Sequence, residues 1–141
     1  MPGWVLDTSV YISAMRRGDG AVLAMRWIGA DSPLWLSAVV LEELYAGVAP
    51  NDRKHLDRLH HDFEKADRLL TPNIKDWVLT GQTLAGIGLR YGYESIGRGR
   101  LTNDTLLAMS AARLGLSVMT ANAKDFERIA SVRDFHWQHV R

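Results

Sequence analysis

Three short apolar runs in the chain have the pattern of strands in a parallel sheet. They span Trp4–Leu6, Leu34–Leu36 and Leu116–Met119. Apolar residues fill mostly consecutive positions there rather than alternate ones, which is typical of a strand covered on both faces. A side chain that carries oxygen follows each run. These polar residues are Asp7, Ser37 and Thr120. The pattern predicts a parallel sheet whose strands end at polar residues.

Between these runs, apolar residues recur at helical spacing. One set repeats at three- and four-residue steps: Leu56, Leu59, Phe63 and Ala66. A second set follows Pro72: Ile74, Trp77, Val78 and Ala85. Such spacing is typical of amphipathic helices. Alternating strands and helices predict an α/β fold with a mostly parallel sheet, helices on both faces, and ligands at the carboxyl ends of the strands.

The composition is that of a single compact domain, which we expect to span residues 1–141. A chain of 141 residues with 47% hydrophobic positions can bury a core without disulfides or structural zinc. It contains no cysteine, which excludes a disulfide framework, an iron–sulfur site and thiol catalysis. No apolar run approaches the ~20 residues that cross a bilayer, and Met1–Trp4 lacks the features of a signal peptide. We therefore expect a cytoplasmic protein without a membrane segment.

The charge balance restricts how nucleic acid could be bound. There are 17 lysines and arginines against 16 aspartates and glutamates, a net charge of +1. This excludes a polycationic coat, so nucleic-acid binding would require a local basic patch or a metal ion.

Asp7 is the first candidate for chemistry. It directly follows an apolar strand, so its carboxylate should emerge at the edge of the sheet where α/β folds place their sites. The alternative is equally good: Asp7, Thr8 or Ser9 could cap the following helix by accepting hydrogen bonds from its free amides.

Glu43 is the second candidate. On a helix it lies one turn from Val39, Val40 and Gly47, and thus projects from an otherwise apolar stripe. A carboxylate placed there costs several kcal/mol unless a cation or hydrogen-bond donors meet it. The alternative is that Glu42 and Glu43 are both solvated charges in the first turn of a helix.

Two further acids follow in the last third of the chain. Asp104 precedes a segment of small and apolar residues, so we expect it in the first turn of a helix, where capping alone could explain it. Asp125 follows the strand that ends near Thr120. Four acids are thus predicted to approach the same edge of the sheet.

These segments together resemble a known family. They are Leu6–Ser9, Glu43–Gly47, Asp104 before its alanine-rich helix, and Thr120–Phe126. Their order and spacing resemble PIN-domain ribonucleases of the VapC toxin type, and the resemblance covers essentially the whole chain. It implies an α/β/α sandwich that cleaves RNA with Mg²⁺ or Mn²⁺. It further implies a homodimer and a small cognate antitoxin.

The resemblance also implies a set of site residues. Three acids and a more variable fourth would hold the metal, which map onto Asp7, Glu43, Asp104 and Asp125. Asn122 stands where many relatives have an acid, so Asn122 and Asp125 are both candidates for the fourth position, with Asp125 favoured for its charge. Ser9 and Thr120 match positions that line the site. Mg²⁺ prefers oxygen ligands of this kind, and metal ions can activate the water that hydrolyses a phosphodiester.

Basic residues near these acids are candidates for RNA contacts. Arg98 and Arg100 flank Gly99 shortly before Asp104 and could bind phosphates, or could simply be solvated. Lys124 and Arg128 are weaker candidates of the same kind. The five tryptophans lie in apolar patterns, which favours the core or a subunit interface over base stacking.

Other functions fit less well. A haloacid-dehalogenase-type phosphatase needs a second acid two residues after the first, where this chain has Ser9, and it leaves Glu43 without a role. A receiver domain needs adjacent acids early in the chain. A nuclease-inactive PIN-like binding module is disfavoured because the three principal acids are present.

Overall fold

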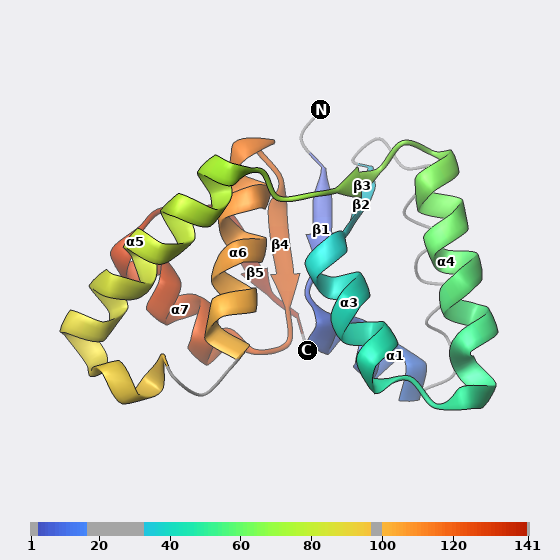
Figure 1. Cartoon of the computed structure of the whole chain (residues 1–141), viewed down its shortest axis with the longest axis horizontal. Coiled ribbons are helices and arrows are strands. Elements are labelled where there is room, and N and C mark those ends of the chain that lie inside the picture. The colour runs from blue at the N-terminus through green and yellow to red at the C-terminus, as the bar shows by residue number, and fades with distance from the viewer. Residues whose placement is uncertain (1–2, 17–32, 97–99, 141) are drawn as a thin grey trace.

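The computed structural model describes residues 3–16, 33–96 and 100–140, without the side chains of Ser95 and Arg100. Its centre is a five-stranded parallel sheet in the order β3-β2-β1-β4-β5 (Figure 1). The strands are β1 (Trp4–Leu6), β2 (Leu34–Ser37), β3 (Leu69–Leu70), β4 (Ser117–Thr120) and β5 (Trp137–His139). In register, Val5 of β1 pairs with Trp35 of β2 and with Val118 of β4.

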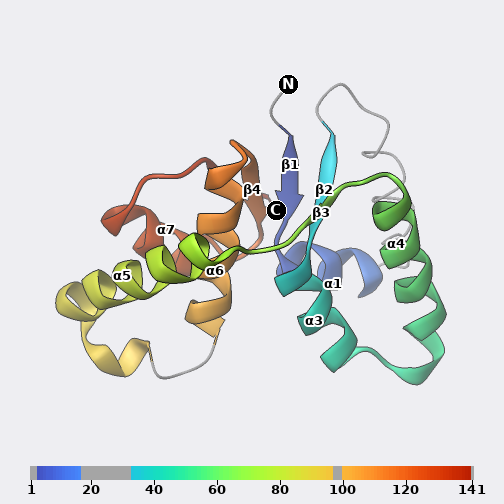
Figure 2. The same cartoon turned by 45° about the horizontal axis from the view of Figure 1, so that its top comes forward.

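Six α-helices of the described residues flank this sheet. They are α1 (Thr8–Arg16), α3 (Ala38–Gly47), α4 (Arg53–Lys65), α5 (Ile74–Tyr91), α6 (Arg100–Arg113) and α7 (Ala123–Val132). There are also two short 3₁₀ helices: η1 (Pro50–Asp52) precedes α4, and η2 (Tyr93–Ser95) follows α5. In Figures 1 and 2, α5, α6 and α7 group beside β4 and β5, whereas α1, α3 and α4 group beside β1 and β2. The predicted α/β/α fold is confirmed.

The central strands are the most buried part of the sheet. Val5, Leu34, Leu36 and Val118 are completely inaccessible to solvent, because helices cover both faces. This double burial explains why apolar residues occupy consecutive positions in these strands. Each buried aliphatic side chain contributes roughly 1.5–3 kcal/mol through the hydrophobic effect. The core thereby holds the carboxyl ends of β1, β2 and β4 together at one edge.

The three strands predicted from apolar runs are all present, whereas two edge strands were not predicted. β3 has only two residues, and β5 ends in the exposed polar residues Gln138 and His139. Edge strands have one unpaired side and less burial, so they need no continuous apolar run. Pairing with β2 and β4 therefore defines them, rather than a local pattern.

Helix α5 forms as predicted, but the apolar residues in its first two turns do not face the core. Ile74, Trp77 and Val78 are 80%, 52% and 52% exposed, while the helix buries Asp76 and Thr80. The polar groups are satisfied: Thr80 Oγ1 donates to the Asp76 carbonyl at 2.8 Å, and Asp76 binds Arg113. An apolar face is thus left on the surface of the described structure.

The prediction that Asp104 lies in the first turn of a helix is wrong. Helix α6 begins at Arg100, so Asp104 is its fifth residue and lies beyond the first turn. The amides without an intrahelical partner are the first four of a helix. The helix extends backward through Leu101, which is buried, and this apolar anchor explains the earlier start. Free amides at the helix start therefore do not account for Asp104.

The helices of the described chain do not include one that combines the length and apolar character needed to cross a membrane.

Candidate active site

Three of the predicted acids line one small cavity at the carboxyl edge of the sheet. Asp7, Glu43 and Asp104 come from the end of β1, from α3 and from α6, respectively. The cavity has a volume of about 20 Å³, which is room for about one water molecule. Its full lining is Asp7, Thr8, Ser9, Ile12, Glu43, Asp104 and Asn122.

The Asp7 carboxylate is held by two hydroxyl groups. Asp7 lies between β1 and α1 and is only 4% exposed. Its Oδ2 accepts hydrogen bonds from Ser9 Oγ at 2.7 Å and from Thr120 Oγ1 at 2.9 Å. Hydrogen bonds to an ionised acceptor are stronger than those between neutral groups. The predicted lining residues Ser9 and Thr120 therefore lie beside Asp7 and orient it.

Backbone amides orient these hydroxyls in turn. The Ala121 amide donates to Ser9 Oγ at 3.0 Å, and the Asn122 amide donates to Thr120 Oγ1 at 2.9 Å. Each hydroxyl accepts from the backbone, which leaves its single hydrogen for the carboxylate. The turn after β4 thus determines how the Asp7 side chain is presented.

Glu43 points to the site and Glu42 does not. Thr8 Oγ1 donates a hydrogen bond of 2.7 Å to Glu43 Oε1, which links α1 to α3. Glu42 is exposed and lines a different cavity. A hydrogen-bond donor thus meets Glu43, which is one of the two ways in which a carboxylate on an apolar stripe can be compensated. The sequence indicates Thr8 only as a possible helix cap, because no local signal relates it to a residue 35 positions away.

Asp104 is a buried carboxylate that lines the cavity. It is 6% exposed and lines the cavity from α6. Its neighbour Thr105 is completely buried and donates to the Leu101 carbonyl at 2.7 Å. A buried carboxylate is costly unless hydrogen bonds or a cation compensate for it. Asp104 and Asp7 thus contribute two buried carboxylates to the same cavity.

Asn122 and Asp125 occupy different positions relative to the cavity. Asn122 lines it, whereas Asp125 is not among the lining residues. Asp125 Oδ2 instead accepts a hydrogen bond of 2.9 Å from Asn122 Nδ2. This bond leaves the other amide atom of Asn122, Oδ1, available as an oxygen donor. The geometry favours Asn122 as the residue at the cavity and Asp125 as the group that orients it.

The donor set suits a hard divalent cation. It consists of carboxylate, amide and hydroxyl oxygens, which Mg²⁺ prefers. Within the described residues, no three histidine, aspartate or glutamate side chains lie close enough to surround a metal ion directly. Mg²⁺ is usually held by one or two carboxylates and keeps several waters, so direct contact by three carboxylates is not required. The residues therefore fit Mg²⁺ or Mn²⁺.

Tyr11 lies on α1 one turn from Thr8 and close to this site in sequence. Its side chain is completely buried, and burial raises the pKa of the hydroxyl above its usual range. The hydroxyl has no hydrogen-bond partner among the described residues. It remains un-ionised and supplies no charge to the site.

The predicted RNA-binding arginines cannot be placed in this site. Arg98 lies outside the described residues, and the side chain of Arg100 is not described, although its backbone begins α6. Lys124 and Arg128 both lie on α7, the helix that follows Asn122.

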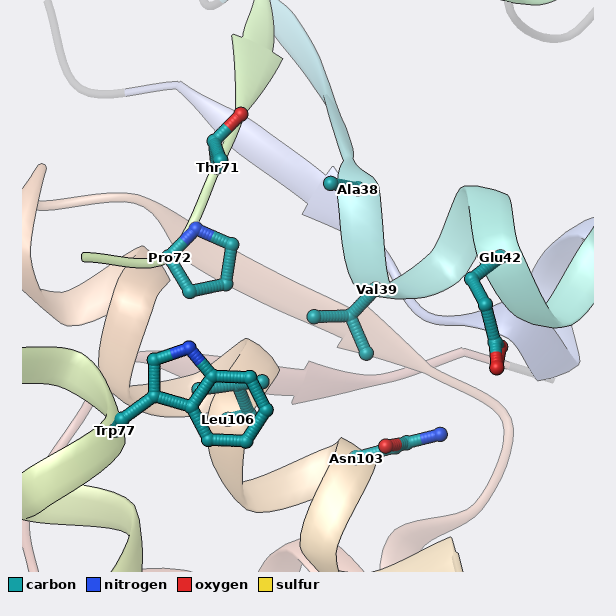
Figure 3. A pocket seen from close by; sticks show the side chains of 8 residues that line it. All are labelled: Ala38, Val39, Glu42, Thr71, Pro72, Trp77, Asn103 and Leu106. Carbon is teal, nitrogen blue, oxygen red and sulfur yellow. The ribbon is translucent and has the colours of Figure 1, made fainter. Parts of the chain in front are cut away.

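A second, larger cavity lies beside the acids and differs in character. It has a volume of about 370 Å³, and Figure 3 shows Val39, Pro72, Trp77 and Leu106 around it, with Glu42 and Asn103 on one side. Most of the lining is apolar. This second cavity is therefore unsuited to a metal ion. It lies near the acid cavity, because Glu42 and Asn103 directly precede Glu43 and Asp104 in the sequence.

Comparison with known proteins identifies the family. The sequence matches the family model of the PIN domain over residues 4–132. The chain belongs to the PIN-domain family. This confirms the family resemblance of the sequence, and the acid cavity of this PIN domain includes three of the four acids that the resemblance implied.

Solved structures of similar fold include VapBC complexes. The PIN domain superposes on a chain of DNA-bound VapBC from Salmonella typhimurium with a TM-score of 0.70 and 23% identity, covering 99% of this chain and 98% of that one. For VapBC2 from Rickettsia felis, bound to a DNA fragment from its promoter, the TM-score is 0.70 at 18% identity, with 98% of each chain covered. For VapBC-1 from nontypeable Haemophilus influenzae, the values are 0.64 and 23%, with 96% of each covered. No curated protein matches the sequence. At these identities, the likeness establishes the fold.

Proposed function

We propose that this PIN domain is a divalent-metal-dependent endoribonuclease and the toxin of a toxin–antitoxin pair that acts in the cytoplasm. One observation carries the proposal: carboxylates from three separate elements line a cavity with room for about one ion or water. Placing like charges together is unfavourable unless a cation is bound. A purely structural role would not require this arrangement.

Asp7, Glu43 and Asp104 would hold the hydrated cation together with Asn122 or Asp125, some of them through its water molecules. When bound, Mg²⁺ or Mn²⁺ supplies an activated water and neutralises charge that develops on the phosphate. The protein contributes orientation. Ser9 and Thr120 hold Asp7, and Thr8 holds Glu43, so these carboxylates need little rearrangement when substrate arrives.

The proposed partners are an RNA substrate, a cognate antitoxin and a second copy of the chain. The antitoxin is supported by the fold, which is that of chains in VapBC complexes. The homodimer is supported by the exposed apolar face of α5, formed by Ile74, Trp77 and Val78, which borders the 370 Å³ cavity. Contiguous apolar surface of this kind usually marks an interface.

An Asp7→Asn variant tests the proposed function. The substitution removes a charged ligand but no core volume, so RNA cleavage in Mn²⁺ should be lost while circular dichroism and the gel-filtration profile stay unchanged. Asp67→Asn is the matched control. Asp67 is exposed and has a φ of 57°, a conformation that asparagine also adopts readily.

Metal-dependent cleavage that persists in Asp7→Asn at the parent's rate would disprove the site. Absence of cleavage by the parent, combined with intact RNA binding, would instead support a nuclease-inactive binding module. The phosphatase alternative predicts hydrolysis of a phosphomonoester such as p-nitrophenyl phosphate, which the nuclease should not hydrolyse.

A further inference from the structure

Three cations form a stripe that leads away from the acid cavity. Lys124 and Arg128 lie one helical turn apart on α7, and Arg90 lies at the end of α5. We call Lys124, Arg128 and Arg90 the basic stripe. Helices α5 and α7 contact each other, as Figures 1 and 2 show from two directions.

The stripe starts at the acid cavity. Asn122, the residue directly before α7, lines that cavity. With a rise of 1.5 Å per residue, Lys124 and Arg128 follow Asn122 by about 3 Å and about 9 Å along the helix axis. A chain of phosphates that passes the cavity can therefore continue along α7.

An aromatic ring lies within the basic stripe. The Arg128 guanidinium lies over the ring of Tyr91, with 5.1 Å between Cζ and the ring centroid. Tyr91 is held in place because its hydroxyl donates to Ser131 Oγ at 3.2 Å, and Arg90 Nη1 donates to the Ser131 carbonyl at 2.7 Å. A guanidinium plane backed by an aromatic ring is a surface on which an unpaired nucleobase can stack.

The cations of the stripe are available to a ligand. No ion pair joins any of the three to an acidic side chain in the part of the chain that the structure describes. Lys124 and Arg90 are exposed, and a hollow of about 410 Å³ lies beside Arg90. With a net charge of only +1 for the whole chain, such a local concentration of unpaired cations is what would attract a polyanion.

We infer that the basic stripe and Tyr91 bind single-stranded RNA on one side of the cleavage site. The cations would contact phosphates, while the Arg128 and Tyr91 pair would stack a base. This inference rests on the proposed ribonuclease function for its choice of ligand, but its residues are separate from the acids of the cavity.

Salt-dependent RNA binding tests the stripe. Binding of a fluorescein-labelled, unstructured 20-nucleotide RNA is followed by anisotropy in EDTA at several KCl concentrations, so that no cleavage occurs. In the variant Lys124→Gln/Arg128→Gln, affinity should fall several-fold. The slope of log K against log[KCl] should become shallower by about 1.4, because each phosphate contact on a single strand contributes about 0.7.

The chain offers a matched control on another helix. Lys54 and Arg58 of α4 are also four residues apart and exposed. Lys54→Gln/Arg58→Gln makes the same change in net charge and should leave the slope nearly unchanged. An unchanged slope in the α7 variant, or an equal loss in the α4 control, would overturn the inference, because net charge rather than position would then explain binding.

Tyr91 provides a second, independent readout. Tyr91→Leu should weaken binding several-fold without altering the salt slope, because stacking releases no counterions. Tyr91→Phe keeps the ring but loses the hydrogen bond to Ser131, so it should bind more tightly than Tyr91→Leu. If Tyr91→Leu binds like the parent, the stacking part of the inference is wrong. Melting temperatures of all variants confirm that each is folded.

Failure of this inference can be told apart from failure of the proposed function. A genuine substrate surface requires that Lys124→Gln/Arg128→Gln raise KM for RNA in Mn²⁺ while kcat is largely retained, whereas Asp7→Asn removes kcat. Lost binding in the stripe variant together with unaffected cleavage in Asp7→Asn would contradict only the metal site. Unchanged binding in the stripe variant together with inactive Asp7→Asn would contradict only the stripe.

Discussion

At the scale of single residues, the site is a set of carboxylates whose orientation depends on neutral neighbours. Ser9 and Thr120 donate hydrogen bonds to Asp7, and Thr8 donates one to Glu43. Asp125 accepts a hydrogen bond from the side-chain amide of Asn122. In the last pair the charged residue orients the neutral one. Charge alone, the reason for favouring Asp125 from sequence, therefore does not determine which side chain reaches the cavity.

The roles of Asn122 and Asp125 can be separated by metal binding. Asn122→Ala removes an oxygen from the cavity lining and should weaken Mn²⁺ binding, measured by the electron paramagnetic resonance signal of free Mn²⁺, by about ten-fold or more. Asp125→Asn can still accept the hydrogen bond from Asn122 and should have a smaller effect. A larger loss in Asp125→Asn would instead make Asp125 a direct ligand, as its charge first suggested.

At the scale of elements, an ion pair between a buried carboxylate and a partly exposed arginine fixes α5 against α6. Asp76 is 1% exposed and forms a reciprocal capping box with Asn73 at the start of α5. Arg113, at the end of α6, binds Asp76 with 3.0 Å between Nε and Oδ2, and its Nη2 donates to the Thr71 carbonyl at 3.0 Å. This arrangement places the N-terminal turn of α5 beside the larger cavity.

Asp76→Ala should be considerably more destabilising than Asn73→Ala. Asn73→Ala removes one cap and should lower the free energy of unfolding by about 1 kcal/mol. Asp76→Ala removes its part of the capping box and leaves Arg113 without its partner, so a loss of roughly 2–4 kcal/mol is expected from urea denaturation. Arg113 is partly exposed, which reduces the second contribution. Equal losses in the two variants would show that the ion pair adds nothing to the cap.

The same element predicts the oligomeric state. If the apolar face of α5 forms a homodimer interface, Val78→Glu should convert the dimer to a monomer in sedimentation velocity, because it places a charge in the contact. Leu114→Glu, at an exposed apolar position beyond the end of α6, is the control and should remain dimeric. A parent that is monomeric at micromolar concentration would contradict the homodimer and leave the face for another partner, such as the antitoxin.

At the scale of the whole molecule, the fold gathers negative charge from positions far apart in sequence. Asp7, Glu43 and Asp104 line one cavity but are separated by 36 and 61 positions in the sequence. Like charges at one site oppose folding, and a bound cation removes that penalty. The stability of the entire domain should therefore depend on metal.

Neutralising Asp104 should weaken that dependence. At pH 7 in EDTA, Asp104→Asn should melt higher than the parent by roughly 2–4 °C, corresponding to about 1 kcal/mol. Millimolar Mn²⁺ should raise the melting temperature of the parent more than that of the variant, because binding to the native state stabilises it by mass action. If Asp104→Asn melts lower in EDTA and gains as much from Mn²⁺ as the parent, Asp104 has a structural role and is not a ligand.

The sequence by itself determined the parts of this protein that depend on local pattern. A strand covered on both faces must be apolar at consecutive positions, so β1, β2 and β4 were recognisable, and the parallel arrangement then required their carboxyl ends to meet at one edge. The same reasoning made Asp7 and Glu43 candidates for that edge. It left open the alternatives that Asp7 caps a helix and that Glu43 is a solvated charge.

Only the tertiary structure decided the features that depend on contacts between distant segments. The hydrogen bond from Thr8 to Glu43 spans 35 residues and that from Thr120 to Asp7 spans 113, so no short pattern contains either. Helical spacing showed that residues 74–85 form a helix, but not which face is buried, because Arg113 compensates for the burial of Asp76 and leaves Trp77 outside. Likewise, the charge of Asp125 is visible in the sequence, whereas its distance from the cavity depends on where the turn after β4 places Asn122.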